Sequence, residues 1–223
     1  MDIAFIDLAQ TCAPMVETEI LAGVVSLESR FGPFSIRING EQSLLKQPST
    51  KAEAIEVATS LASERKDIRL GLGGIGMDEL QKQRLSISDA FDPCTNLRAT
   101  ATLLDEYYRL AVKAGADPMQ AGQVMLQSWY GRDDASVGAM VKYDRQVRQE
   151  AKWLGKILAA LRINDGAEGE RASETRAVDS VAEVEADAPV VNRKVSTPPW
   201  DVFNSRRRSS VLVFQNSQME QSE

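Results

Sequence analysis

The sequence predicts an α+β domain that is mainly helical, has one small β-hairpin and is followed by a disordered C-terminal tail. Two observations predict this class. Apolar residues recur at helical spacing in most segments of residues 1–162. In contrast, one short stretch alternates around an Asn-Gly pair. The composition, 43% hydrophobic and 6% aromatic, fits a small helical core.

Two helices are expected at the N-terminus. The first covers about Ile3 to Cys12, and the second begins near Met15 and stops at Gly32-Pro33. The last turn of the second helix contains Glu28. This residue is either a solvated helix-end glutamate or a buried carboxyl group. Burial would disfavour its charged form, which prepares a carboxyl group to act as a general acid.

A β-hairpin and a third helix follow in the expected order. Residues 34–38 alternate, Asn39-Gly40 follows, and the chain returns through residues 44–45, a pattern typical of a type I′ turn. Thr50 and Glu53 then form a capping box for the next helix.

Residues 70–76 are the most glycine-dense part of the chain. They differ from a phosphate-binding loop because no Gly-Lys-Ser/Thr follows and no preceding hydrophobic strand sets up a dinucleotide fold. The pattern is more typical of a tight turn that lets the main chain approach a neighbouring group closely.

Three helices complete the predicted domain, at about Asn96–Lys113, Pro118–Tyr130 and Ser136–Leu161. Residues 163–187 are rich in acidic residues and are predicted to form a disordered linker. Residues 188–223 are predicted to be a flexible tail. Alternatively, an aromatic anchor, a basic cluster and a β-prone segment within it form a docking peptide. The basic cluster of three arginines is too short to predict a nucleic-acid site.

Composition excludes several classes of function. The chain has no histidine, which excludes Ser-His-Asp and Cys-His catalysis and disfavours a transition-metal site. The net charge of -6 argues against general nucleic-acid binding. We expect no cofactor, no membrane span and no signal peptide. Cys12 and Cys94 are far apart, and are either two buried thiols or one long-range disulfide.

Several short motifs resemble one known family. They are Leu8-Ala9-Gln10-Thr11-Cys12-Ala13-Pro14, Glu28-Ser29, Leu70-Gly71-Leu72, Ala90-Phe91-Asp92-Pro93-Cys94-Thr95-Asn96-Leu97, Ser128-Trp129-Tyr130-Gly131 and Tyr143. In this order, over about the first 150 positions, they resemble lytic transglycosylases of the goose-lysozyme-like (SLT) superfamily. The similarity is greatest to the lytic transglycosylase subunit of bacterial type IV secretion and conjugation systems.

The resemblance implies a lysozyme-like domain that cleaves the β-1,4 bond between N-acetylmuramic acid and N-acetylglucosamine, forming a 1,6-anhydro ring. Glu28 would be the single acid and base. The residues implied to contact the glycan are Ser29, Leu72, Gly73, Tyr130 and Tyr143, whereas Asn96 would be structural and Cys12–Cys94 a disulfide. The implied partners are peptidoglycan strands and, through the tail, secretion-channel proteins in the periplasm.

The chain departs from the family pattern at Gly74 and Gly76, where the family has glutamine and asparagine. Two side-chain hydrogen bonds to the glycan, each contributing about 1 kcal/mol, would therefore be lost. One alternative is a catalytically weak or inactive protein that binds peptidoglycan and assists assembly. Another is a hydrolase of the lysozyme type.

Overall fold

The computed structural model describes residues 2–40 and 44–164, all of which lie within one compact unit. The predicted tail, and all of the predicted linker except its first two residues, lie outside the described residues. The elements are β1 (Asp2–Ala4), α1 (Phe5–Cys12), α2 (Thr18–Ser29), β2 (Ile36–Ile38), α3 (Lys51–Ser63), β3 (Ile68–Leu70), β4 (Ile75–Gly76), α4 (Met77–Lys82), α5 (Ile87–Ala90), α6 (Pro93–Lys113), α7 (Pro118–Gly131), α8 (Ala135–Met140), α9 (Tyr143–Leu154), the 3-10 helix η1 (Leu158–Ala160) and β5 (Arg162–Asn164).

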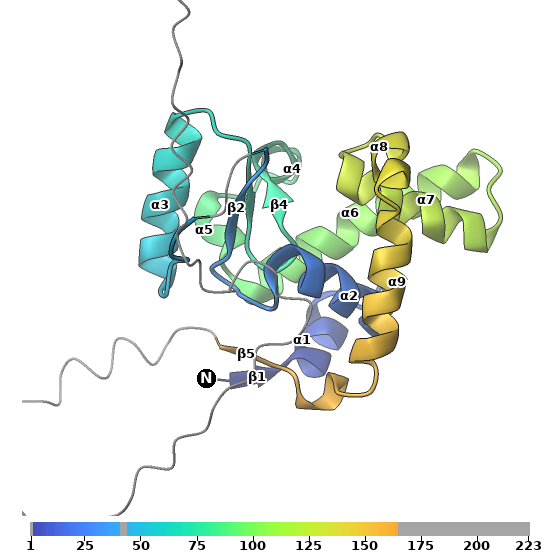
Figure 1. Cartoon of the computed structure of the whole chain (residues 1–223), viewed down its shortest axis with the longest axis horizontal. Helices are drawn as coiled ribbons and strands as arrows, with labels where there is room; N and C mark the ends of the chain where they lie inside the picture. Colours follow the sequence, from blue (N-terminus) through green and yellow to red (C-terminus); the bar gives the residue numbers. More distant parts are fainter. Residues whose placement is uncertain (1, 41–43, 165–223) are drawn as a thin grey trace, which may run out of the picture. The chain divides into compact units, whose positions relative to one another are not determined.

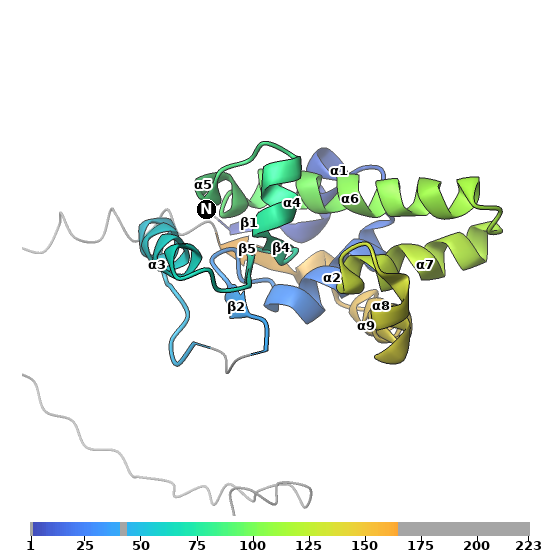
Figure 2. The same ribbon diagram turned by 90° about the horizontal axis from the view of Figure 1, so that it is seen from above.

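The helices form the larger part of the fold, as the sequence predicts. Helix α2 packs along α9, and α6 runs beside α7 (Figures 1 and 2). Asp92 caps the N-terminus of α6, because its side chain accepts a hydrogen bond from the Thr95 N–H at 2.7 Å. Pro93 occupies the first turn of this helix. Large apolar side chains from helices and strands share one core: Phe5, Leu21, Ile36, Leu70, Leu97 and Leu126 are all fully buried.

The three-stranded sheet differs from the predicted hairpin. Strand β2 pairs antiparallel with β3, and β3 pairs with β4, so the strand before Asn39-Gly40 does not pair with residues 44–45. On the other edge of β2, the Gln47 side chain bonds the Ile36 N–H at 2.8 Å and the Ile36 carbonyl at 2.9 Å. This amide satisfies the backbone groups that a returning strand would have paired.

Strands β1 and β5 form a second, two-stranded sheet that the sequence analysis missed. Ile3 and Ala4, predicted to begin the first helix, lie in β1 and pair with Ile163 and Arg162. Strand β5 includes residues 163–164, which the sequence assigned to the linker. The sheet therefore joins the two ends of the described domain.

The predicted helix Ser136–Leu161 is divided into α8, α9 and η1. Lys142 has φ of 55°, a left-handed conformation that ends α8 and allows α9 to start in a new direction. Helices α4 and α5 were also missed, because they are too short to show helical periodicity.

A disulfide joins Cys12, at the end of α1, to Cys94, in the first turn of α6. This confirms the pairing that the family resemblance implied. Among the described residues, no helix combines the length and the apolar composition that crossing a membrane requires.

Candidate active site

Glu28 is buried, which resolves the two alternatives for this residue. It lies in the last turn of α2, and only 5% of the residue is exposed. The Tyr143 hydroxyl donates to Oε1 at 2.7 Å, and the Arg37 guanidinium donates to Oε2 at 2.6 Å. The Arg69 guanidinium lies 3.8 Å from Oε2. The negative charge of the buried Glu28 carboxylate is therefore compensated by two guanidinium groups and a hydroxyl group.

Arg37 and Arg69 face each other across strands β2 and β3, where they are paired in register. Like charges directly opposite in a sheet are unfavourable, and the Glu28 carboxylate between them offsets the repulsion. Arg69 also donates to the Tyr130 carbonyl at 3.0 Å, and Arg37 donates to the Leu27 carbonyl at 3.3 Å. Neither arginine was identified from the sequence, although the alternation of residues 34–38 places Arg37 on the opposite face of the strand from its apolar neighbours.

Tyr143 and Tyr130 lie side by side, with ring centroids 5.0 Å apart. Burial, together with the neighbouring Glu28 carboxylate, raises the pKa of Tyr143 well above its usual value. Its hydroxyl therefore keeps its proton and donates it to the hydrogen bond with Glu28. The break at Lys142 makes this contact possible, because Tyr143 is the first residue of α9.

The glycine-rich segment forms the β3–β4 turn and approaches Glu28 closely, as predicted for a tight turn. Gly74 has φ of 69°, and a Cβ atom there would lie 2.7 Å from Glu28 Oε2. A glutamine side chain at position 74 therefore requires Glu28 to move. The family glutamine and the present position of Glu28 are incompatible.

The Asn96 side chain fixes the same β3–β4 turn by hydrogen bonds. Its side chain accepts from the Gly73 N–H at 2.8 Å and donates to the carbonyls of Leu70 and Ala90 at 3.1 and 2.8 Å. Asn96 is itself buried, with 1% exposed. These contacts give Asn96 the position expected of a structural residue.

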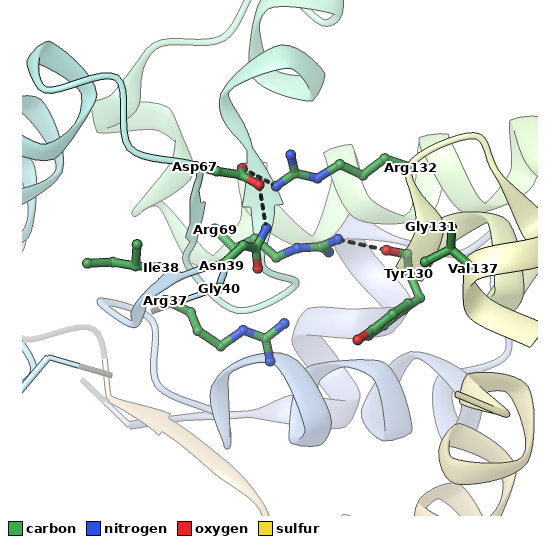
Figure 3. Close-up of a pocket in the computed structure, with 10 residues that line it drawn as sticks. All are labelled: Arg37, Ile38, Asn39, Gly40, Asp67, Arg69, Tyr130, Gly131, Arg132 and Val137. Carbon is green, nitrogen blue, oxygen red and sulfur yellow. Dashed lines mark hydrogen bonds and ion pairs between the residues drawn. The ribbon is translucent and has the colours of Figure 1, made fainter. Parts of the chain in front are cut away.

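A cavity of about 490 Å³ is lined in part by Arg37 and Arg69, the two arginines next to Glu28 (Figure 3). Its lining comes from the β2 and β3 segments, from the end of α7 and from α8: Arg37, Ile38, Asn39, Gly40, Asp67, Arg69, Tyr130, Gly131, Arg132 and Val137. Figure 3 shows Arg37 and Arg69 extending from the strands toward Tyr130. Asp67 is already engaged, by Asn39 at 3.0 Å and by Arg132 at 2.5 Å.

Of the residues expected to contact glycan, Tyr130 lines this cavity. Tyr143 is not among the lining residues, but it contacts Glu28 through its hydroxyl and Tyr130 through its ring. Leu72 is fully buried in the core, so its side chain is not presented to the cavity. Gly73 is engaged by Asn96, and the Ser29 hydroxyl donates to the Val25 carbonyl of its own helix at 3.0 Å. Within the described ranges, no group of three or more Cys, His, Asp or Glu residues could hold a metal ion.

We expect Gly74→Ala to destabilise the protein by about 1–3 kcal/mol and to reduce activity, because it combines a left-handed backbone with a contact on Glu28. Urea unfolding measures the first effect. Gly115→Ala is the matched control, since Gly115 also has a positive φ, of 96°, but no atom lies within 4 Å of its added Cβ. Equal losses in the two variants would show that the contact with Glu28 contributes nothing.

No family model and no solved structure matches the chain. Among curated proteins, the type IV secretion system protein virB1 of Brucella suis biovar 1 is 36% identical over 110 residues, 49% of this chain and 46% of the relative. Protein virB1 of Agrobacterium fabrum is 30% identical over 159 residues, 70% of this chain and 62% of the relative. Protein virB1 of Rhizobium radiobacter is 29% identical over 154 residues.

The chain thus spans about half the length of the Brucella relatives, and 62% of the Agrobacterium relative. The matches to proteins from several bacteria agree on one name. The chain is therefore similar to proteins named VirB1, of which the Brucella relatives are named type IV secretion system proteins.

Proposed function

We propose that the protein is a peptidoglycan lytic transglycosylase that opens the cell wall locally for a type IV secretion or conjugation apparatus. One observation carries this proposal: a single buried glutamate, Glu28, is positioned by a tyrosine hydroxyl beside a cavity. The VirB1 homologues support the secretion context. Peptidoglycan strands in the periplasm would be the substrate.

In the proposed reaction, Glu28 acts first as an acid and then as a base. Its carboxyl proton passes to the oxygen that links N-acetylmuramic acid to N-acetylglucosamine, and the glycosidic bond breaks. The carboxylate then accepts the proton of the muramic acid 6-hydroxyl, whose oxygen bonds to the anomeric carbon. The carboxyl group is regenerated, and water is not consumed.

The residues that contact Glu28 have different roles in the acid step and in the base step. Tyr143 donates to Oε1, so we assign proton transfer to Oε2, the oxygen that Arg37 contacts. Arg69 stabilises the carboxylate that remains after the proton has left. Two carboxylates, as in most glycosidases, are not required by a reaction in which the substrate supplies its own nucleophile.

The tail carries the proposed contacts with channel proteins. We assign this role to residues 188–223, and a linker role to the acidic residues before them. Both segments lie outside the described residues.

A non-catalytic protein that binds peptidoglycan is the second candidate. The observation that favours it is that both oxygens of Glu28 already accept hydrogen bonds from protein donors. A protein in which this arrangement persisted on binding would retain glycan without cleaving it.

Mass spectrometry of sacculi digested with the purified protein separates the candidates. A lytic transglycosylase releases anhydro-muropeptides, which are about 18 mass units (one water) lighter than the products of a hydrolase. The proposal expects the lighter products. Reducing ends would indicate a lysozyme-type hydrolase, and retention on sacculi without release would indicate the binding protein.

A further inference from the structure

Arg37 covers the oxygen of Glu28 that is assigned to proton transfer, because its guanidinium donates to Oε2 at 2.6 Å. A guanidinium group has only donors, and it binds a carboxylate more strongly than a neutral carboxyl group. Arg37 also lines the cavity, so a substrate oxygen that approaches Oε2 from the cavity has to displace this guanidinium.

Arg37 is also the partner of Glu28 with the most freedom to move. Its side chain is 34% exposed, whereas that of Arg69 is 7% exposed and is tied to the Tyr130 carbonyl. Tyr143 is almost fully buried. Arg37 lines the cavity, so its guanidinium can turn into that space without passing through the core (Figure 3).

An arginine that leaves a carboxylate needs another anion. Within the cavity, the carboxylate of Asp67 is already bonded to Arg132 and Asn39. Arg69 and Arg132 line the same space, which makes it a poor place for an additional unpaired cation. A carboxylate brought by the ligand matches the planar guanidinium and completes the exchange.

We propose that Arg37 neutralises Glu28 in the free protein and exchanges it for a carboxylate of the bound glycan, so that carboxylate-bearing peptidoglycan is the preferred substrate. This inference rests on the proposed transglycosylase function. As Arg37 leaves, Oε2 of Glu28 becomes accessible to the substrate oxygen of the proposed reaction. The ligand carboxylate belongs either to a stem peptide or to the lactyl group of muramic acid.

The test compares three soluble glycan substrates with the same sugars. The first carries stem peptides, the second has been stripped to free lactyl carboxylates, and the third has those carboxylates converted to neutral amides. For the wild type, we expect kcat/KM to be about tenfold lower on the neutral strands, the scale of one charge-assisted hydrogen bond. The first two substrates identify the source of the carboxylate.

Variants at position 37 show whether the preference depends on this guanidinium. Arg37→Gln should cleave all three substrates at similar kcat/KM, and Arg37→Lys should regain part of the preference, because lysine keeps the charge but not the planar fork. Arg109→Gln is the control, since Arg109 pairs with Asp105 within α6 and does not line the cavity. It should keep the wild-type preference.

Two results would overturn the inference: a wild type without preference, or an Arg37→Gln variant that keeps it. The release of anhydro products tests the proposed function separately. If no substrate is cleaved, isothermal titration of the wild type and Arg37→Gln with the stripped and neutral strands still decides. A tenfold difference in Kd that disappears in the variant supports the exchange, and equal Kd values for the wild type reject it.

Discussion

Glu28→Gln is expected to lower the release of anhydro-muropeptides by at least about 10³-fold, because the amide cannot supply the proton that the proposed reaction takes from Glu28. The variant should still fold. A glutamine amide can donate to the Tyr143 oxygen and accept from Arg37, so both contacts survive with one donor reversed. Product release is measured by chromatography of digested sacculi.

The stability of Glu28→Gln separates catalytic loss from unfolding. Arg69 would lose its nearby charge, and we expect a loss of about 1–3 kcal/mol in the free energy of unfolding. Glu79→Gln is an informative comparison, since Glu79 is also buried, with 7% exposed. Its Oε2 finds no hydrogen-bond partner within residues 2–40 and 44–164, and its Oε1 lies 3.9 Å from the Arg132 guanidinium.

A mechanism with one carboxyl group expects Glu79→Gln to retain most activity. Comparable losses in the two variants would instead indicate a two-carboxylate glycosidase. Wild-type activity in folded Glu28→Gln would remove Glu28 from the mechanism.

Removing the Cys12–Cys94 disulfide is expected to cost about 4 kcal/mol of unfolding free energy. The bridge closes a loop with a sequence separation of 82, and loop-closure entropy predicts a value of about 4 kcal/mol for such a length. Urea unfolding of the wild type and of Cys12→Ala/Cys94→Ala, each with and without reductant, measures the effect.

The design includes its own control. Reductant should lower the unfolding midpoint of the wild type and leave that of the double variant unchanged. A wild-type midpoint that does not respond to reductant would contradict the prediction. Cys94 lies two residues before Asn96, which holds the glycine turn against Glu28, so the reduced protein should also lose activity at lower temperature.

Local patterns predicted the parts of the fold that depend on local interactions. The end of α2 near Glu28 follows from helical periodicity and from Gly32-Pro33, and the close approach of the glycine turn follows from the freedom of glycine at positive φ. The same patterns left Glu28 as either solvated or buried, and the structural role of Asn96 was implied only by the family resemblance.

Nonlocal pairing could not be predicted in the same way. The Asn39-Gly40 signal is local, but β2 pairs with β3, some thirty residues later, while the Gln47 side chain occupies the edge where the hairpin was expected. The register of β2 and β3 places Arg37 opposite Arg69. Both guanidinium groups lie next to Glu28 because α2 packs beside these strands, which local sequence patterns do not indicate. The break at Lys142 carries no glycine or proline to mark it, so the contact of Tyr143 with Glu28 also depends on tertiary structure.

Four elements meet at the Glu28 carboxylate: α2 supplies it, and β2, β3 and α9 supply its partners. Under the proposed function, natural selection acts on Glu28 twice, once through catalysis and once through the assembly of the domain. A descendant without enzymatic activity would still be under pressure to keep this glutamate, because its loss leaves the buried Arg69 and the partly exposed Arg37 without their counter-ion. In comparisons among related chains, retention of the glutamate alone is therefore weak evidence of activity, and loss of the tyrosine or of the cavity is the more informative change.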